Sequence, residues 1–315
     1  MADALCKLPA GAAVVDRRTF IQTSLLLAGA RLSAAATPAA HHPLGLQLYT
    51  VMPLLQQDFE GTLRAVAAIG YEEVETIGTF GRDPAGLRAL FDKYNLRSPS
   101  QHMVPGNLYD VFNRLTRKEL SFEEASRQWQ QIMSVERVAP IMEECIRNAT
   151  ALGQKYIVWQ ILWPQQMRTR ALLEKFCAGL NEAGRLAARA GHVLNYHNHA
   201  EELKPHDGVI PYDFILANTD PDLVKMELDC FWTVAAGADP AAYFREYPGR
   251  FRQCHLKDGT AKGDVTVVGE GIMKFGPLLE AARAAGVEHY YVEQDGAAEP
   301  LQASTQAYQY LRRYF

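Results

Sequence analysis

The chain has 315 residues, of which 48% are hydrophobic and 22% charged, and its formal net charge is −4. This balance suits a soluble globular domain of enzyme size. It lacks the basic excess that marks nucleic-acid binders, so we expect no nucleic-acid partner. After a short leader, the remaining bulk fits one α/β barrel, and we expect one catalytic domain rather than two.

Residues 1–40 are predicted to be an export signal and leader. Arg17 and Arg18 precede an uncharged segment at 23–30 and an Ala-rich stretch that ends at residue 40. This pattern resembles a twin-arginine signal followed by a small-residue cleavage region. The apolar run is too short for a stable membrane anchor, so we expect a periplasmic mature protein. The alternative is an amphipathic helix that stays attached.

Strand-like and helix-like segments alternate along residues 41–315. In chain order they are strand 44–50, helix 62–69, strand 71–77, helix 84–94, strand 97–103, helices 118–133 and 138–152, strand 155–162, helix 168–190, strand 192–198, helix 212–218, strand 223–229, helix 240–247, strand 251–257, helix 275–285, strand 288–293 and helix 305–315. This α/β alternation predicts a single-domain (β/α)8 TIM barrel. The competing doubly wound sheet lacks a Gly-x-Gly-x-x-Gly after the first strand.

Residues 105–150 hold more chain than one crossover helix needs. We interpret them as an enlarged excursion between the third strand and its helix, where substrate-shaping structure is common. The cysteines of the mature chain stand alone in helices or strands, without a Cys-x-x-Cys pair, so we expect buried free thiols and no disulfide. They are Cys145, Cys177, Cys230 and Cys254.

Polar residues gather at the ends of the last four strands. The clusters are Tyr196-His197-Asn198-His199, Glu227-Leu228-Asp229, Cys254-His255-Leu256-Lys257-Asp258 and Val292-Glu293-Gln294-Asp295. The side-chain period of two places His255 and Lys257 on one face of their strand, opposite Cys254. Buried imidazoles and carboxylates need a partner, and a divalent cation provides one. Since catalytic groups of TIM barrels project from these strand ends, the clusters predict a metal site there.

Earlier strand ends add further polar and aromatic candidates. These are Gln47, Tyr49, Glu75, His102, Trp159 and Gln160. Glu75 is either a substrate contact or the partner of a neighbouring cation. His102 is either close to the ligand or an ordinary loop histidine. Trp163, Trp232 and Phe231 would form an apolar wall for a sugar ring, unless they belong to the core.

The mature chain resembles the xylose isomerase-like TIM-barrel superfamily of sugar isomerases and epimerases, which also includes the endonuclease IV type of repair nuclease. The motifs that carry the resemblance are Gly45-Leu46-Gln47-Leu48-Tyr49, Gly70-Tyr71-Glu72-Glu73-Val74-Glu75, Val268-Gly269-Glu270-Gly271 and Val292-Glu293-Gln294-Asp295. The resemblance implies one divalent metal, with Mn²⁺ expected first and Zn²⁺, Mg²⁺ or Co²⁺ as alternatives. It implies Asp229, His255 and Glu293 as ligands.

The fourth ligand is where this chain departs from the family pattern. Sugar epimerases of the family carry a glutamate at the end of strand five that is both ligand and base, whereas this chain offers Asn195, His197 and His199. The alternation of side chains along the strand and the position of His197 at its end favour His197 as the replacement for this glutamate. The alternative is that His197 is a core histidine without a ligand role. Asp229 has an alternative as well, because Asp is a favoured helix cap. One of the two bases of a two-glutamate epimerisation is therefore missing.

The constellation predicts proton removal next to a carbonyl, followed by an enediolate. Glu293 is the expected base, Lys257 would polarise the substrate or form a salt bridge, and His102 completes the predicted catalytic set. The predicted substrate contacts are Gln47, Glu75, His199 and Trp232.

The first functional hypothesis is a metal-dependent sugar isomerase or epimerase with a small-molecule carbohydrate substrate. The alternatives are a lyase or hydratase of 3-keto-sugars or 3-keto-glycosides, and a non-catalytic carbohydrate-binding barrel. A homo-oligomer is compatible with the sequence.

Overall fold

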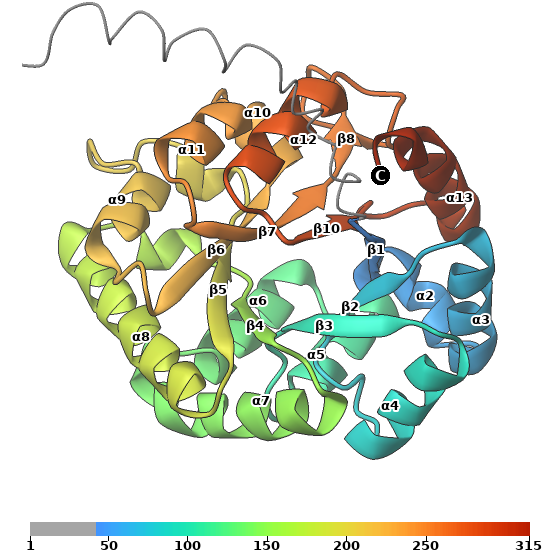
Figure 1. The fold of residues 1–315 in the computed structure, drawn as a ribbon. Helices are drawn as coiled ribbons and strands as arrows, with labels where there is room; N and C mark the ends of the chain where they lie inside the picture. Colours follow the sequence, from blue (N-terminus) through green and yellow to red (C-terminus); the bar gives the residue numbers. More distant parts are fainter. Residues whose placement is uncertain (1–41) are drawn as a thin grey trace, which may run out of the picture. The chain divides into compact units, whose positions relative to one another are not determined.

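The computed structural model describes residues 42–315, which exclude the predicted export signal and leader at 1–40. Eight parallel strands close into a barrel with helices around it (Figure 1). They are β1 (Leu44–Gln47), β2 (Glu73–Ile77), β3 (Arg97–His102), β4 (Tyr156–Trp159), β5 (Val193–His197), β6 (Val224–Asp229), β7 (Phe251–Leu256) and β10 (His289–Val292). The predicted (β/α)8 TIM barrel is confirmed.

Helices follow the strands and pack against their apolar backs. They are α2 (Met52–Leu55), α3 (Phe59–Ile69), α4 (Pro84–Lys93), α5 (Leu108–Thr116), α6 (Phe122–Ile132), α7 (Val138–Leu152), α8 (Arg170–Arg189), α9 (Pro211–Asn218), α10 (Cys230–Ala235), α11 (Pro240–Glu246), α12 (Phe275–Ala284) and α13 (Pro300–Leu311). In the range the structure describes, no helix combines the length and apolar character needed to cross a membrane.

The last four barrel strands, β5, β6, β7 and β10, have the apolar back and polar front that their sequences predict. Cys254 and Leu256 of β7 join the apolar core. Gln253 points into the barrel instead, where its Oε1 accepts a hydrogen bond from Asn195 of β5 and its Nε2 lies 3.4 Å from the hydroxyl of Tyr291 on β10. The interior is therefore polar, and its polar groups bond across the barrel.

The excursion after β3 differs from the sequence expectation. The helix expected at 118–133 is α6 at Phe122–Ile132, and an additional helix that was not expected, α5 at Leu108–Thr116, precedes it. Lys118 adopts a left-handed conformation (φ 60°), which breaks the helical path. Ser121 and Glu124 then form a capping box that starts α6 at Phe122.

Smaller elements at the same end of the barrel were also missed. β1 ends at Gln47 rather than at residue 50, because the Gln47 side chain accepts a hydrogen bond from the Tyr49 backbone and the chain enters a 3-10 helix, η1 (Leu48–Val51). The short helix α10 follows β6 directly. A hairpin of β8 (Asp258–Gly259) and β9 (Val265–Thr266) follows β7.

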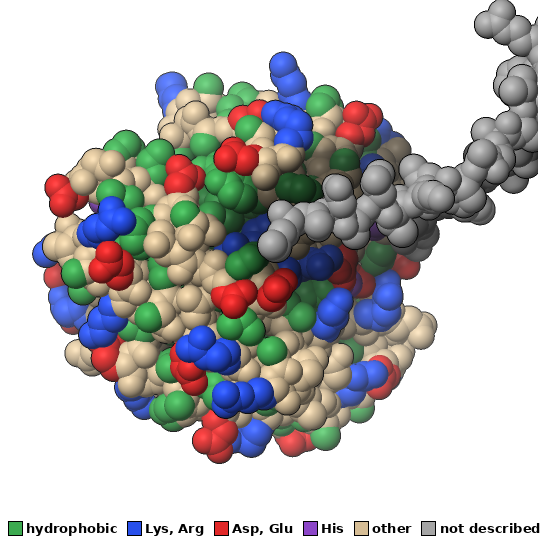
Figure 2. All heavy atoms as spheres, turned by 60° about the vertical axis from the view of Figure 1, so that its left-hand side comes forward, with side chains coloured by type: hydrophobic (Ala, Val, Ile, Leu, Met, Phe, Trp, Pro, Cys, Tyr) green, Lys and Arg blue, Asp and Glu red, His purple; other side chains and the backbone are tan. Residues whose placement is uncertain are grey.

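Four cysteines of the described range are buried and free. They are Cys145, Cys177, Cys230 and Cys254. On the face shown in Figure 2, acidic and basic side chains are interspersed, without a continuous patch of either sign.

Candidate active site

Asp229, His255 and Glu293 meet at the C-terminal end of the barrel. Asp229 closes β6, His255 lies on β7 and Glu293 directly follows β10. The parallel register pairs Asp229 with His255, so neighbouring strand ends bring these side chains together. One candidate ligand atom from each residue lies within 4.8 Å of the others. We call these three residues the upper ligand set.

Glu75 holds the imidazole of His255 in place. The His255 Nδ1 lies 2.8 Å from Glu293 Oε2, while its Nε2 lies 2.7 Å from Glu75 Oε2. Glu75 is fixed in turn by Gln47 Nε2 at 2.7 Å and Ser100 Oγ at 2.5 Å. A carboxylate on the far nitrogen is the usual arrangement for a metal-binding histidine.

Gln47 and Glu75 thus lie behind His255 rather than at the surface of the barrel mouth. Both side chains are fully buried. The predicted contact of either residue with substrate stays a prediction, and the geometry gives them a positioning role.

Asp229 caps a helix, which was the alternative role expected for it. Its Oδ1 accepts a hydrogen bond of 2.9 Å from the Trp232 backbone and caps α10. Its Oδ2 is buried and makes no hydrogen bond to any described residue, but it forms an ion pair of 3.2 Å with Lys257 Nζ. Burial raises the pKa of Asp229 to about 6, against the opposing effect of Lys257. A buried carboxylate oxygen that lacks a hydrogen bond needs a cation nearby.

Lys257 supplies part of that positive charge. Its Nζ lies 3.2 Å from Asp229, 3.0 Å from Glu293 and 2.6 Å from Asp295. Burial would lower the pKa of this ammonium, but the three carboxylates outweigh it and raise the pKa well above its usual value. The indole of Trp232 covers the ammonium at 5.1 Å. Both predicted roles of Lys257, salt bridge and polarising cation, are compatible with this position.

Glu293 remains ionised despite its burial. Burial acts to raise its pKa, but Lys257 and His255 lower the pKa well below its usual value. Its contacts with His255 and Lys257 both use Oε2. Oε1 takes part in neither of these two contacts.

The upper ligand set fits a divalent cation. It offers two carboxylates and one imidazole, a mixed oxygen and nitrogen set that Mn²⁺ and Zn²⁺ both accept. The buried Oδ2 of Asp229 and the second-nitrogen bond of His255 are independent signs of such a site. Metal identity stays a prediction.

A cavity of about 260 Å³ lies at this end of the barrel, and Glu293 is the member of the upper ligand set that lines it. Its polar side includes His102, His197, His199, Glu293 and Asp295. Its apolar side comes from Tyr49 and from the excursion and its neighbours, namely Phe112, Phe122, Trp129 and Trp163. The cavity is therefore polar at the barrel and aromatic at the excursion.

The three residues of the predicted aromatic wall lie in different surroundings. Trp163 lines the cavity. Phe231 is fully buried in the core. Trp232 packs 6.5 Å from the ring of His199. The Nδ1 of His199 is buried without a partner among the described residues, and burial, followed by Lys257, lowers the pKa of this imidazole to about 3.

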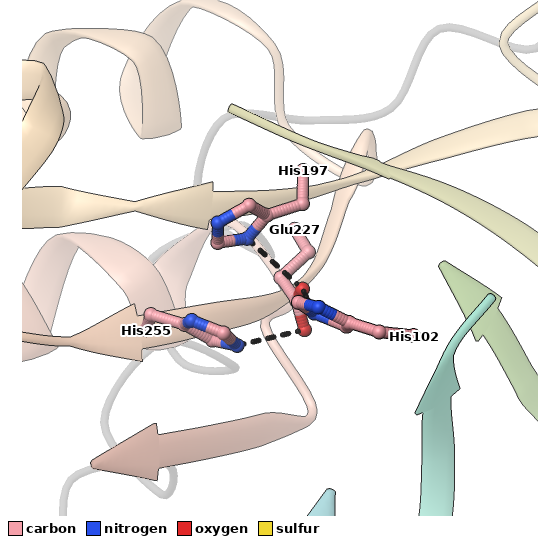
Figure 3. A group of neighbouring side chains, drawn as sticks. All are labelled: His102, His197, Glu227 and His255. Carbon is pink, nitrogen blue, oxygen red and sulfur yellow. Dashed lines mark hydrogen bonds and ion pairs between the residues drawn. The ribbon is translucent and has the colours of Figure 1, made fainter. Parts of the chain in front are cut away.

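The predicted fourth ligand, His197, lies in a different group. The imidazoles of His102, His197 and His255 surround the Glu227 carboxylate (Figure 3), and these four residues form one group. We call these four residues the lower ligand set. Figure 3 shows the imidazoles of β3, β5 and β7 around one carboxylate of β6. The alternative ligand Asn195 is instead hydrogen-bonded to Gln253.

Glu227 was not assigned a role from the sequence. Its position two residues before Asp229 places it on the same inward face, one step deeper in the barrel. This shared face was the feature of the sequence from which a role for Glu227 could have been predicted. His102, predicted to be catalytic, uses its Nε2 to contact Glu227 at 2.9 Å and Glu75 at 3.3 Å.

The fold agrees with comparisons to known proteins. The chain belongs to the xylose isomerase-like TIM barrel family, whose model matches residues 63–314. An inosose dehydratase from Lacticaseibacillus casei is 25% identical over 288 residues, which cover 82% of this chain and 91% of the relative.

Two solved structures share the fold. A sugar phosphate isomerase/epimerase from Parabacteroides distasonis has a TM-score of 0.70 at 23% identity, covering 89% of this chain and 97% of that one. A probable 3-DHS dehydratase from Bacillus anthracis has a TM-score of 0.61 at 11% identity, covering 86% and 98%.

Proposed function

We propose that this protein is a divalent-metal-dependent dehydratase that removes water from a cyclic polyhydroxy ketone. The observation that carries the proposal is the Glu293 carboxylate, held between His255 and Lys257 and lining the cavity. The similarity to an inosose dehydratase over most of both chains supports this reaction class.

The first step removes a proton from the carbon next to the ketone. Glu293 is ionised and lines the cavity, so it is placed to take this proton. A cation on Asp229, His255 and Glu293 would polarise the ketone when bound. Lys257 adds a fixed positive charge beside the developing enolate oxygen, which compensates for the weak basicity of Glu293.

The second step expels the hydroxyl on the next carbon. The enolate electrons form a carbon–carbon double bond, the C–O bond breaks, and the hydroxyl leaves as water after receiving one proton. Asp295 lines the cavity beside Glu293. Burial raises the pKa of Asp295, and the carboxyl stays hydrogen-bonded to Lys257. We assign the donation of this proton to the protonated carboxyl of Asp295; afterwards Glu293 releases a proton to solvent and Asp295 takes one up, which restores both groups.

Epimerisation is the second candidate, because it shares the first step. The sugar phosphate isomerase/epimerase with the same fold keeps this candidate open. Epimerisation needs a second group that returns a proton to the opposite face of the carbon. His197, at the end of β5, lines the cavity, but its Nδ1 is engaged by Glu227. Dehydration needs no base on that face.

The size of the cavity favours a small substrate. Its volume of about 260 Å³ lies below the range of roughly 300–1,000 Å³ that is usual for drug-sized ligands. One sugar or cyclitol ring would fill its polar side, next to Glu293 and Asp295. The aromatic side chains of the excursion would then cover the apolar face of that ring.

The test is turnover of Mn²⁺-loaded protein with a keto-inositol, a 3-keto-glucoside and a ketose in heavy water, followed by NMR. The expected result is loss of one hydroxyl from a cyclic ketone and formation of an unsaturated product. Deuterium uptake next to the carbonyl with an inverted centre and no loss of water would instead establish epimerisation. Neither exchange nor elimination with any of the three substrates would refute both enzymatic assignments.

A further inference from the structure

We propose that the lower ligand set is a second divalent-cation site, separate from the upper one. It is formed by His102, His197 and Glu227, with His255 at its edge. The proposal concerns metal content and does not depend on which ketone is the substrate or on which reaction follows.

The geometry is that of ligands gathered around one point. Glu227 Oε2 lies 2.9 Å from His102 Nε2 and 3.1 Å from His197 Nδ1, and Glu227 Oε1 lies 3.4 Å from His255 Nε2. Ligand atoms placed ~2.0–2.2 Å from a tetrahedral ion are about 3.4 Å from one another. The side chains would therefore need only small adjustments to bind one ion.

A second, independent observation points to a missing partner. Glu227 is fully buried, and its Oε1 makes no hydrogen bond within residues 42–315. His255 Nε2, the nearest candidate at 3.4 Å, is held instead by Glu75 at 2.7 Å. A buried carboxylate oxygen left in this state costs free energy unless a cation lies beside it.

The balance of charge at this end of the barrel leads to the same conclusion. Five carboxylates face one ammonium, that of Lys257. The carboxylates are Glu75, Glu227, Asp229, Glu293 and Asp295. With His102 and His255 neutral, as metal-bound imidazoles are, one divalent ion in the upper set leaves two of these negative charges uncompensated in a largely buried region. A second divalent ion in the lower set neutralises them.

The two sets differ in the ion that they favour. The upper set has two carboxylates and one imidazole, whereas the lower set has up to three imidazoles and one carboxylate. Imidazole-rich sets suit Zn²⁺ and Co²⁺, and carboxylate-rich sets suit Mn²⁺. We therefore assign Zn²⁺ or Co²⁺ to the lower set. Because His102 and His197 both line the cavity, that ion would face the substrate as well.

The experiment measures bound metal directly. Full-length protein is stripped with a chelator, loaded with Zn²⁺ or Co²⁺, desalted and analysed by elemental mass spectrometry, and the visible absorption of the Co²⁺ form is recorded. The expected stoichiometry is two ions per chain. Glu227→Gln and His102→Ala should each reduce it to one and should remove one component of the Co²⁺ spectrum.

His192→Ala is the matched control, because this buried imidazole bonds Thr150 and the Gln154 backbone instead of the ligand sets. It should keep two ions. Asp229→Asn should keep the ion of the lower set and lose the upper one. A single ion in the wild type would overturn the proposal, even if the variants fail to fold. Two ions retained in a folded Glu227→Gln variant would also overturn it.

Discussion

Charged side chains are arranged differently at the two ends of the barrel. At the N-terminal end, Glu73 bonds His289 at 2.7 Å and Arg97 at 3.1 Å, and the Glu288 carboxylate is shared between Lys155 and Arg252, each at 2.9 Å. At the C-terminal end, carboxylates crowd around shared partners, and Asp229 Oδ2 and Glu227 Oε1 lack hydrogen bonds within the described range. The carboxylates at the N-terminal end are each paired with cationic groups, whereas the C-terminal end has carboxylate oxygens to which a cation could bind.

The same difference is found at the two ends of one strand, β10, where one glutamate is expected to stabilise the fold and the other to take part in the reaction. Glu288 immediately precedes β10 and Glu293 immediately follows it. Burial acts to raise the pKa of Glu288, but hydrogen bonds from Tyr156 and Lys155 outweigh it and lower the pKa. TIM barrels place catalysis at the C-terminal face and stability at the opposite face, and the predictions below test that division here.

The largest expected effect is that of metal removal. Chelation should abolish turnover, because the ketone would lose its strongest polarising group. It should also lower Tm, since an ion present at ~100 times its Kd contributes about 2.7 kcal/mol to stability. Thermal unfolding and initial rates, measured before and after chelation, provide the check. Mn²⁺ should restore both values, and full turnover in protein shown to be metal-free would refute the prediction.

Glu293→Gln should lower kcat by about 10²–10⁴-fold, the usual contribution of a positioned general base. The variant keeps the shape of the side chain but cannot take up the proton. Steady-state kinetics and deuterium exchange next to the carbonyl measure the loss.

Glu288→Gln is the control at the other end of the same strand. It should leave kcat within about twofold and cost at most about 1 kcal/mol, because its partners are partly exposed. If the two variants had equal effects on kcat, the proposed division between the ends would be wrong.

Lys257→Met should lower the free energy of unfolding by about 3–5 kcal/mol, because it leaves three carboxylates without their ammonium. Urea denaturation of the metal-loaded protein measures the change. Lys155→Met removes a lysine of the N-terminal end whose side chain is 53% exposed, and it should cost less than about 1 kcal/mol. Similar losses in both variants would contradict this prediction.

The smallest effect concerns pH and Glu202, next to the site. Burial raises the pKa of Glu202 to about 7. The folded state therefore binds this proton more tightly than the unfolded state, so the contribution of Glu202 favours folding at low pH and is lost as the pH rises through about 7. Between pH 5 and 8 the loss should be on the order of 1–3 kcal/mol.

The measurement is urea unfolding of metal-free wild type and Glu202→Gln at both pH values. The variant keeps the hydrogen-bonding position facing Tyr196 and the His199 backbone but cannot titrate. The stability of the wild type relative to the variant should fall as the pH rises. Parallel curves for the two proteins would assign the pH dependence to other groups.

The sequence contained enough information for the barrel and for the meeting of Asp229, His255 and Glu293. Alternation of period two identifies the inward face of each strand, and parallel strands bring their ends to one face of the barrel. Neither inference needs contacts between distant residues.

The parts that the sequence did not predict depend on long-range contacts or on short elements. The orientation of His255 is set by Glu75, which lies 180 positions away along the chain. His197 groups with Glu227 instead of with Asp229 because of how deep each side chain lies in the barrel. The alternation of side chains along a strand tells which face a residue is on but not how deep it lies. Helix α10 has six residues, too few for a helical period to stand out.

The aromatic side of the cavity comes from a segment that the barrel does not need for closure. Helices α5 and α6 lie between β3 and α7, and their side chains Phe112, Phe122 and Trp129 reach the cavity from outside the strand register. Insertions or replacements in this segment could therefore change which ring is accepted while the proton-transferring groups stay in place. Substrate choice and reaction chemistry could evolve separately in this protein.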